Sequence, residues 1–422
     1  MAEAAVAPGR NWAGNYAYQA RRLHQPTSLD EACEIVARGG RLHVLGSRHS
    51  FNDIADTAGE LISLDAVDPD FALAADRRSV TVGGAARYGE VARFLAEHGL
   101  ALRNFASLPH ISVAGAIATG THGSGDRNLC LAADVLAFDL ITPSGEIRHC
   151  SPETLGADYA GAVVGLGALG VVSRVTLAVV PAFDVRQDVY GSLPWQTFEQ
   201  HFDEITALAY SVSMFTDFGA SGIGQVWLKG RVGVDGPPPP DLFGARPATA
   251  AVHPVPGMDP AFATEQLGVP GRAHERLPHF RLGFTPSNGD ELQSEYLVDR
   301  RDAVSAVRAV RRLADRLAPV LQIAEIRTIA ADDLWLSPSM GRDSVGLHFT
   351  WVPRQADVEA LLVELEAVLA RFEPRPHWGK VFVAGTGRLR AAYPLLPRFA
   401  ELARSFDPQG RFRNPFLDRV LS

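Results

Sequence analysis

Val44-Leu45-Gly46-Ser47-Arg48-His49-Ser50-Phe51-Asn52-Asp53 is the stretch from which the rest of the chain is best interpreted. The residues that lead into it, Arg41–Leu45, predict a short strand, and the glycine and serines that follow predict a polar turn. Such a turn presents consecutive backbone N–H groups to an anion, and serine hydroxyls add further donors. The stretch therefore predicts a phosphate site beside the nucleophilic ring of His49. An ordinary turn at a strand end is the alternative.

Composition limits the classes of protein to consider. The chain has 422 residues, 46% hydrophobic and 21% charged, which is typical of a globular protein with two domains. A net charge of −8 argues against nucleic acid or an anionic membrane surface as a partner. The longest apolar run, Gly161–Val172, is too short to span a bilayer, and Met1–Gly14 lacks the features of a signal peptide. We expect a cytoplasmic monomer that binds small molecules and is not inserted in a membrane.

Cysteine and lysine are both sparse. The three cysteines, Cys33, Cys130 and Cys150, are scattered and predict neither a disulfide framework nor a metal site. Of the 40 basic residues, only Lys229 and Lys380 are lysine. The lysine ammonium is compact and its pKa can be shifted by its surroundings, whereas arginine stays charged. We expect such a role for Lys380, whereas chance survival explains Lys229 more readily.

The first half of the chain is predicted to be mixed α/β. Helices are expected at Leu29–Ala37 and Tyr88–His98, and further strands at Leu61–Leu64 and Ser79–Val82. Between Asn104 and Gly125 small residues prevail without a helical or strand period. Small side chains let a planar ring or a pyrophosphate approach the backbone, although a tightly packed structural loop has the same composition.

Gly165-Leu166-Gly167-Ala168-Leu169-Gly170 matches the dinucleotide-binding pattern of glycines. That pattern works only where a strand precedes it and a helix follows. Here the β-branched stretch Val171–Val180 follows and predicts a strand. The sequence therefore excludes a Rossmann turn, and the glycines are interpreted as backbone close to a cofactor or to a neighbouring strand.

The second half is predicted to begin after Pro181, where the segments become longer and more aromatic. The pattern indicates an α+β fold with an antiparallel sheet. Strands are expected at Leu292–Val298, Val320–Ile329, Val345–Val352 and Lys380–Val383, and helices at Asp302–Leu317 and Val358–Phe372. We expect three units: residues 1–180, residues 181–380, and a C-terminal segment 381–422 that returns to the first unit.

Alternation along these strands places polar residues on one face of the sheet. Glu325 and Arg327 share a face, as do His348 and Thr350, and Gln293 lies in a third strand. Together they would offer the donors and acceptors that a polyhydroxylated ligand requires. A neutral His348 could act as a general base, with Arg327 lowering its pKa, and Lys380 could face a redox centre. A solvated sheet face is the alternative.

Several motifs resemble known flavoproteins. Four segments of the first half resemble the PCMH-type FAD-binding domain of the vanillyl-alcohol oxidase superfamily: the His49 loop, Ala106–Gly115, Thr119–Gly125 and Leu166–Gly170. In the second half, four motifs resemble bacterial alditol (xylitol or sorbitol) oxidases: His253–Met258, Glu275–Phe280, Leu292–Leu297 and Arg375–Lys380. The resemblance extends from Arg10 to Pro408, so it covers nearly the whole chain.

The resemblance implies an FAD linked covalently to His49 and a two-domain fold in which the second domain binds the substrate. The implied FAD contacts are Val44, Leu45, Gly46, Ser47, Arg48, Ser50, Ser107, Ser112, Gly115, Ala116, Ile117, Ala118, Thr119 and Val171. The implied polyol contacts are Ser107, Gln293, Glu325, Arg327, His348, Thr350 and Lys380.

The implied reaction is the oxidation of a terminal alcohol. His348, or its network with Arg327, would take the hydroxyl proton while a hydride passes to the flavin, which gives an aldose. Molecular oxygen would then reoxidise the flavin and release hydrogen peroxide. Ala106 is small enough to leave oxygen a path to the ring. The catalytic set is thus His348, Arg327, Lys380 and Glu325.

One residue departs from the resemblance: Arg48 stands where relatives tend to carry glycine, which leaves the backbone geometry of the loop open. Two other functions stay possible. An aldonolactone oxidase or dehydrogenase of the same superfamily would share the fold, and a non-catalytic flavin-binding protein could have kept the fold without the reaction. The polar set on the sheet favours an acyclic polyol.

Overall fold

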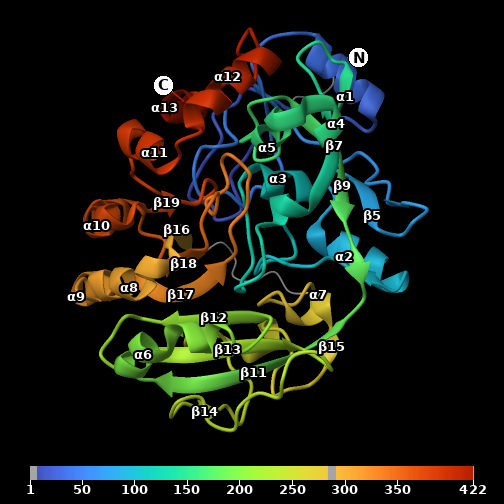
Figure 1. Cartoon of the computed structure of the whole chain (residues 1–422). Coiled ribbons are helices and arrows are strands. Elements are labelled where there is room, and N and C mark those ends of the chain that lie inside the picture. The colour runs from blue at the N-terminus through green and yellow to red at the C-terminus, as the bar shows by residue number, and fades with distance from the viewer. Residues whose placement is uncertain (1–6, 284–290, 422) are drawn as a thin grey trace.

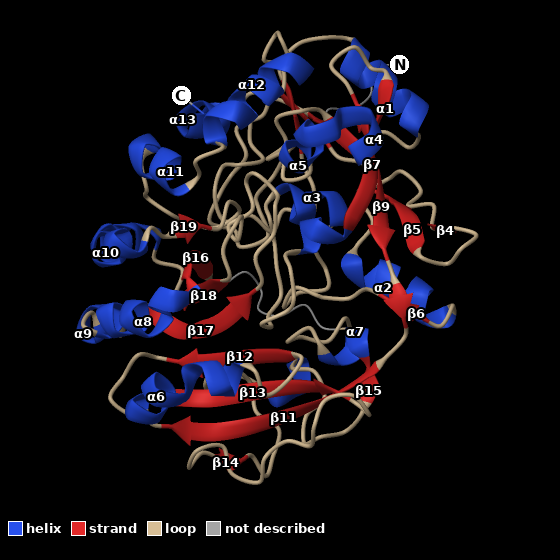
Figure 2. Cartoon of the chain, viewed as in Figure 1, coloured by secondary structure: helices blue, strands red, loops and turns tan. Residues whose placement is uncertain are grey.

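The structure is a computed structural model that describes residues 7–283 and 291–421. Its strands form two groups, which Figure 1 and Figure 2 show one above the other. The upper group comes from the first half of the chain, and the lower one is a large antiparallel sheet from the second half. Both chain ends lie at the top of this view.

The chain opens with a small parallel sheet. Its strand order is β1 (Leu23–His24), β3 (Glu60–Ile62), β2 (Leu42–Val44). The predicted first helix is confirmed as α1 (Leu29–Ala37), where the Ser28 side chain accepts a hydrogen bond from the backbone of Glu31. Ala32 and Val36 of α1 pack on Ile62 of β3. This packing fixes the end of β2, from which the His49 loop starts.

A five-stranded antiparallel sheet completes the first half. Its order is β4 (Ala72–Leu73), β5 (Ser79–Gly83), β9 (Val171–Ala178), β7 (Val135–Ile141), β8 (Ile147–Cys150). The helices here are α2 (Tyr88–Glu97), α3 (Val113–Ala118), α4 (Pro152–Leu155) and α5 (Tyr159–Ala162), and β6 (Leu100–Ala101) pairs with β10 (Val180–Pro181). Because α5 precedes the glycine turn and β9 follows it, the exclusion of a Rossmann turn is confirmed.

The second half is built on a nine-stranded antiparallel sheet, as predicted. Its order is β14 (Arg246–Pro247), β11 (Asp184–Leu193), β13 (Ile223–Arg231), β12 (Ser211–Thr216), β17 (Leu321–Ile329), β18 (Ser344–Trp351), β16 (Leu292–Asp299), β19 (Arg375–Pro376), with β15 (Gly271–Arg272) paired to β11. Helices α6 (Trp195–Thr206), α8 (Ala303–Arg311) and α10 (Gln355–Leu369) bury their apolar side chains on one face of this sheet. The other face, which is turned toward the first half, keeps its polar residues.

The remaining helices are α7 (Ala273–Arg276), α9 (Ala314–Leu317), α11 (Thr386–Ala392), α12 (Leu396–Phe406) and α13 (Pro415–Leu421). Phe399 of α12 and Leu417 of α13 belong to the same apolar core as Val80 and Val175 of the five-stranded sheet. The end of the chain therefore packs on the first half. The unit boundaries at residues 180 and 380 stay predictions.

A short seam joins the two groups of strands. Gly125 and Ile329 form a parallel bridge. The Gly125 amide donates to Thr328 at 2.8 Å, and the Ala330 amide donates to Asn128 at 3.0 Å. The small-residue tract of the first half is thus hydrogen-bonded to the end of β17.

Three expectations need correction. Lys380–Val383 is not a strand: the Val381 amide donates to Gln293 of β16 at 2.8 Å, but the pairing does not extend. The tract 104–125 contains α3, a helix of small residues, and the helix expected at Asp302–Leu317 is divided into α8 and α9. Within residues 7–283 and 291–421, no helix is long and apolar enough to cross a membrane.

Candidate active site

A cavity of about 450 Å³ lies between the loops of the first half and the polar face of the large sheet. Every site residue expected from the sequence lines this cavity except Val171. Val171 is buried at the start of β9 in a separate core, although its neighbours Gly170 and Val172 do reach the cavity. The structure therefore brings together residues that lie more than 300 positions apart in the chain.

The first wall of the cavity is the loop after β2, docked on the start of α3. The Ser112 amide donates to the Ser47 hydroxyl at 3.0 Å. A Cβ atom on Gly46 would lie 2.8 Å from Ser112 Oγ, and one on Gly115 would lie 2.7 Å from the same atom. At Gly46 the missing side chain lets the loop approach the start of α3, whereas at Gly115 the close atom belongs to the N-cap of the same helix. Bare backbone is therefore what this wall offers to a ligand.

His49 lies in this wall with one ring nitrogen available. Its Nδ1 is buried and has no hydrogen-bond partner among the described residues. The ring stacks on Trp12, with centroids 5.3 Å apart and planes 19° apart. Burial lowers the pKa of His49 to about 4, so the imidazole is neutral at neutral pH. A neutral ring with an unused nitrogen is the form that can act as a nucleophile.

Arg48 has a backbone φ of 63°, in the left-handed region where glycine is favoured. Arg48 thus adopts a conformation that glycine would take readily at this position. The guanidinium donates to the carbonyls of Pro8 and Arg10 and lies 5.6 Å from the ring centroid of Tyr18. These contacts offset the cost of holding a side chain in that conformation, about 1–2 kcal/mol.

The glycine turn before β9 supports the same wall. Leu166 and Gly167 both have positive φ, and the Leu166 amide donates to the last residue of α3, Ala118, at 3.1 Å. A Cβ atom on Gly167 would lie 2.9 Å from the ring of His43. With close backbone approaches, small side chains and an unpartnered histidine nitrogen, these residues fit an FAD.

The second wall is the polar face of β16, β17 and β18. Glu325 of β17 lies opposite His348 of β18, which lies opposite Glu295 of β16. Arg327 donates to Glu295 Oε1 from Nε at 3.1 Å and from Nη2 at 2.8 Å, and Lys380 Nζ lies 2.7 Å from Glu295 Oε2. Three adjacent strands and one loop thus place two carboxylates and two cations around one point.

The two carboxylates are buried and ionised. Burial would raise their pKa values, but neighbouring cations outweigh it. Arg327 and Lys380 hold the pKa of Glu295 well below its usual range, and Arg327 with His279 does the same for Glu325. Two negative and two positive charges therefore balance one another in the wall.

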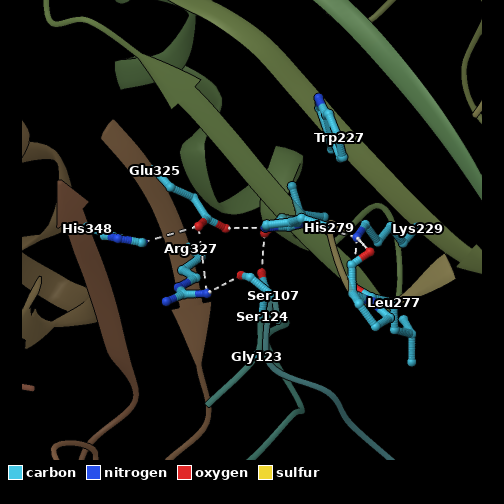
Figure 3. A network of polar contacts seen from close by, with 12 residues as sticks. Ser107, Gly123, Ser124, Trp227, Lys229, Leu277, His279, Glu325, Arg327 and His348 are labelled. Carbon is cyan, nitrogen blue, oxygen red and sulfur yellow. Dashed lines mark hydrogen bonds and ion pairs between the residues drawn. The ribbon is translucent and has the colours of Figure 1, made fainter. Parts of the chain in front are cut away.

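Ser107 links the two walls. Its hydroxyl accepts from Arg327 Nη1 at 3.2 Å across the cavity, as Figure 3 shows. Gln293 and Thr350 lie opposite each other in the ladder between β16 and β18, and both line the cavity. The side-chain amide of Gln293 donates to Glu291 at 2.6 Å. A ligand in the cavity would therefore meet hydroxyl, amide, carboxylate and guanidinium groups.

His348 is the free base of this wall. Both ring nitrogens are buried without a hydrogen-bond partner among the described residues, and Nδ1 is 3.6 Å from Glu325 Oε2. Burial lowers the pKa of His348 to about 4. A lowered pKa agrees with the prediction, but Arg327, the expected cause, is not the main one. Burial lowers the pKa most, Lys380 is the next cause that lowers it, and Arg327 contributes less.

Several functional candidates were missed from the sequence. Glu295 follows Gln293 by two residues, so strand alternation could have identified it. His122 lies 3.4 Å from Glu295 Oε1, and His279 Nε2 lies 2.8 Å from Glu325 Oε1, but both come from loops without a period. Lys229, to which no role was assigned from the sequence, is fully buried beside His279.

Comparisons with known proteins match the two halves of the chain to different family models. Residues 20–151 match the family model described as FAD binding domain, and residues 289–420 match the one described as D-arabinono-1,4-lactone oxidase. An alditol oxidase from a Streptomyces species is 50% identical over 97% of this chain and 98% of that protein. An L-gulono-1,4-lactone dehydrogenase from Mycobacterium tuberculosis is 28% identical over 97% of the chain and 98% of that protein.

Among solved structures, a cholesterol oxidase from B. sterolicum has a TM-score of 0.79 with 15% identity, covering 98% of this chain and 96% of that one. At that identity the likeness concerns the fold alone. It bears out the α+β fold with an antiparallel sheet that was expected from the sequence.

Proposed function

Because the chain belongs to the same family of FAD-dependent oxidoreductases as the Streptomyces alditol oxidase, we propose that it oxidises a terminal hydroxyl of an acyclic polyol such as xylitol or sorbitol. The observation that carries this proposal is the second wall. It lines one side of the cavity with donors and acceptors. These suit a chain of hydroxyl groups, because each hydroxyl both donates and accepts. The product would be the corresponding aldose.

The roles of the residues follow from their charges. Arg327 and Lys380 border the cavity and stabilise the negative charge that develops on the alcohol oxygen. His348, which is neutral and has no hydrogen bond from the described residues, takes the hydroxyl proton, and Glu325, 3.6 Å away, stabilises the imidazolium that results. Gln293, Thr350 and Ser107 bind the remaining hydroxyls. When bound, FAD accepts the hydride from the alcohol carbon and passes the electrons to O₂, which yields hydrogen peroxide.

His49 is proposed as the covalent anchor of the flavin. Its buried, unpartnered Nδ1 and neutral ring support this role. Acid-precipitated protein should remain yellow, and His49→Ala should release its flavin under the same treatment. A colourless precipitate from the unmutated protein would contradict covalent attachment without affecting the proposed reaction.

Ala106 is proposed to keep a path open for oxygen. It is buried and lines the cavity beside Ser107. Ala106→Val should slow reoxidation of the reduced protein by O₂ while leaving its reduction by polyol nearly unchanged. Stopped-flow measurement of both half-reactions separates the two effects.

Peroxide formation across a panel of xylitol, sorbitol, mannitol and glycerol tests the function as a whole. An aldonolactone oxidase is the second candidate, since the model matched by residues 289–420 bears that description. An L-gulono- or D-arabinono-lactone should therefore be included. Turnover of a lactone in preference to every polyol would overturn the proposal, and reduction by no substrate would favour a non-catalytic flavin-binding protein. A cytoplasmic location and a monomeric state stay predictions.

A further inference from the structure

Lys229 of β13 is an unusual buried cation. Its Nζ lies 2.7 Å from the carbonyl oxygen of Leu277, 3.0 Å from that of Pro278 and 3.0 Å from Nδ1 of His279 (Figure 3). Within the part of the chain that the structure describes, no carboxylate lies within ion-pair distance of it. Lys229 does not line the cavity, whereas His279 does. Any effect of Lys229 on a substrate would therefore pass through His279.

The three contacts use all three N–H donors of an ammonium group. Two donors go to the carbonyl oxygens, which can only accept. The third points at His279 Nδ1, which must then accept as well. Burial opposes the charge and lowers the pKa of Lys229 to about 7, so the ammonium form prevails below neutral pH.

This arrangement sets the tautomer of His279. Burial, with Lys229 as the next cause, lowers the pKa of His279 to about 4, so its ring carries a single proton. With Nδ1 accepting from Lys229, that proton is on Nε2, which lies 2.8 Å from Glu325 Oε1. The other tautomer would turn two donors toward each other at Nδ1 and leave a lone pair facing a carboxylate.

The imidazole plane is also fixed. Its ring packs edge-to-face on Phe215, at 5.4 Å and 69°, and on Trp227, at 5.5 Å and 76°. The second oxygen of Glu325 then lies 3.6 Å from both Arg327 Nη1 and His348 Nδ1. A continuous chain of polar contacts thus leads from Lys229 to the base and the guanidinium of the second wall.

We propose that Lys229 is a positioning residue for the alcohol oxidation: it holds His279 in the tautomer that donates from Nε2 to Glu325, and so keeps Glu325 ionised and oriented beside His348 and Arg327. This inference rests on the proposed function. It gives a reason for a buried lysine in a chain that otherwise uses arginine almost throughout. Guanidinium, with its fixed planar fork, does not match three acceptors around one nitrogen.

The first test needs no variant. Histidine ¹⁵N shifts of the holoenzyme at pH 6 report which ring nitrogen carries the proton, and the His279→Gln spectrum assigns the signals. We expect His279 to be protonated at Nε2 only. A proton on Nδ1 would overturn the proposal, whether or not any polyol is oxidised.

The second test is Lys229→Met, which keeps the length of the side chain and removes its donors. We expect the rate of flavin reduction by polyol to fall about 10- to 100-fold, as is usual when a supporting partner of a site residue is lost. Flavin content should stay unchanged, and the His279 signals should show a mixture of tautomers. A purely structural role would lower stability without changing the tautomer, and an unchanged tautomer would overturn the proposal.

A double variant distinguishes action through His279 from any other route. Glutamine at position 279 can donate to Glu325 from its amide without help from Lys229. Adding Lys229→Met to His279→Gln should therefore lower the reduction rate by less than twofold. Full additivity of the two losses would show that Lys229 acts elsewhere and would overturn the proposal. If no polyol reduces the unmutated protein, the proposed function fails, while the tautomer result remains valid.

Discussion

The two walls of the cavity present different chemistry to a ligand. The wall made by the His49 loop and α3 offers backbone and small side chains, and it leaves no room for a Cβ atom at Gly46 beside Ser112. The opposite wall offers ionised side chains that hold one another, from β16, β17 and the loop of Lys380. The first wall is therefore sensitive to added volume, and the second to lost charge. Each can be disturbed separately.

Removing a charge from the second wall should have the largest effect. Lys380→Met leaves Glu295 with Arg327 as its remaining cation and takes one positive charge from the cavity. We expect flavin reduction by polyol to slow by about 10² or more, because a preorganised charge at such a site often contributes that much. Anaerobic stopped-flow measures the rate. Arg388→Met is the control, since that side chain is 58% exposed, and an unchanged rate in Lys380→Met would remove Lys380 from the mechanism.

Adding volume to the first wall should come next. In Gly46→Ala the new methyl group would lie 2.8 Å from Ser112 Oγ, so either the hydroxyl rotates and loses its bond from the Ser47 amide or the loop shifts, at a cost of about 1–3 kcal/mol. We expect a lower flavin-to-protein absorbance ratio, with the protein that retains flavin still reduced by polyol. Gly387→Ala is the matched control because nothing lies within 4 Å of a Cβ atom there. Full flavin content in Gly46→Ala would contradict the close approach.

Acid should destabilise the second wall through its histidines. Burial lowers the pKa values of His122, His279 and His348 to about 4. Between pH 6.5 and 4 these histidines bind protons in the unfolded chain but not in the folded protein, so their contribution to stability falls as pH falls through that window and is constant above it. Each histidine contributes at most about 1.4 kcal/mol per pH unit. The Tm of His122→Gln should therefore decrease less between pH 7 and pH 5 than that of the unmutated protein, and equal decreases would contradict the lowered pKa of His122.

Arg48→Gly should have the smallest effect. Glycine relieves the positive φ, a gain of about 1 kcal/mol, but it loses the contacts with Tyr18 and with two backbone carbonyls. These changes nearly cancel, so Tm and flavin content should both stay close to those of the unmutated protein. A marked loss of flavin would show that the guanidinium itself belongs to the first wall.

Sequence reasoning succeeded where a local pattern carries the structure. Alternation identified Glu325, Arg327, His348 and Thr350 as one face, and the glycine turn was rejected as a Rossmann motif because a strand follows it. The same alternation, carried two residues past Gln293, would have found Glu295. Lys380 was expected on a strand, but its segment makes one ladder-like bond, from Val381 to Gln293, and the Lys380 carbonyl accepts from the Asn52 side chain instead.

Other residues could not be found in this way. His122 and His279 come from loops whose positions depend on contacts across the whole fold. Lys229 carried a compositional signal, but that signal does not say which residues surround it. Strand faces are local and periodic, whereas the partners that reach them from loops are set by tertiary packing.

The seam between Gly125 and Ile329 has a consequence for motion. Backbone hydrogen bonds join the end of β17, which carries Arg327, to the tract that carries Ser107 and continues from α3. These hydrogen bonds restrain the relative motion of the two walls at this edge. A ligand that spans the cavity would therefore meet two walls whose spacing at this edge is held by bonds of the backbone itself.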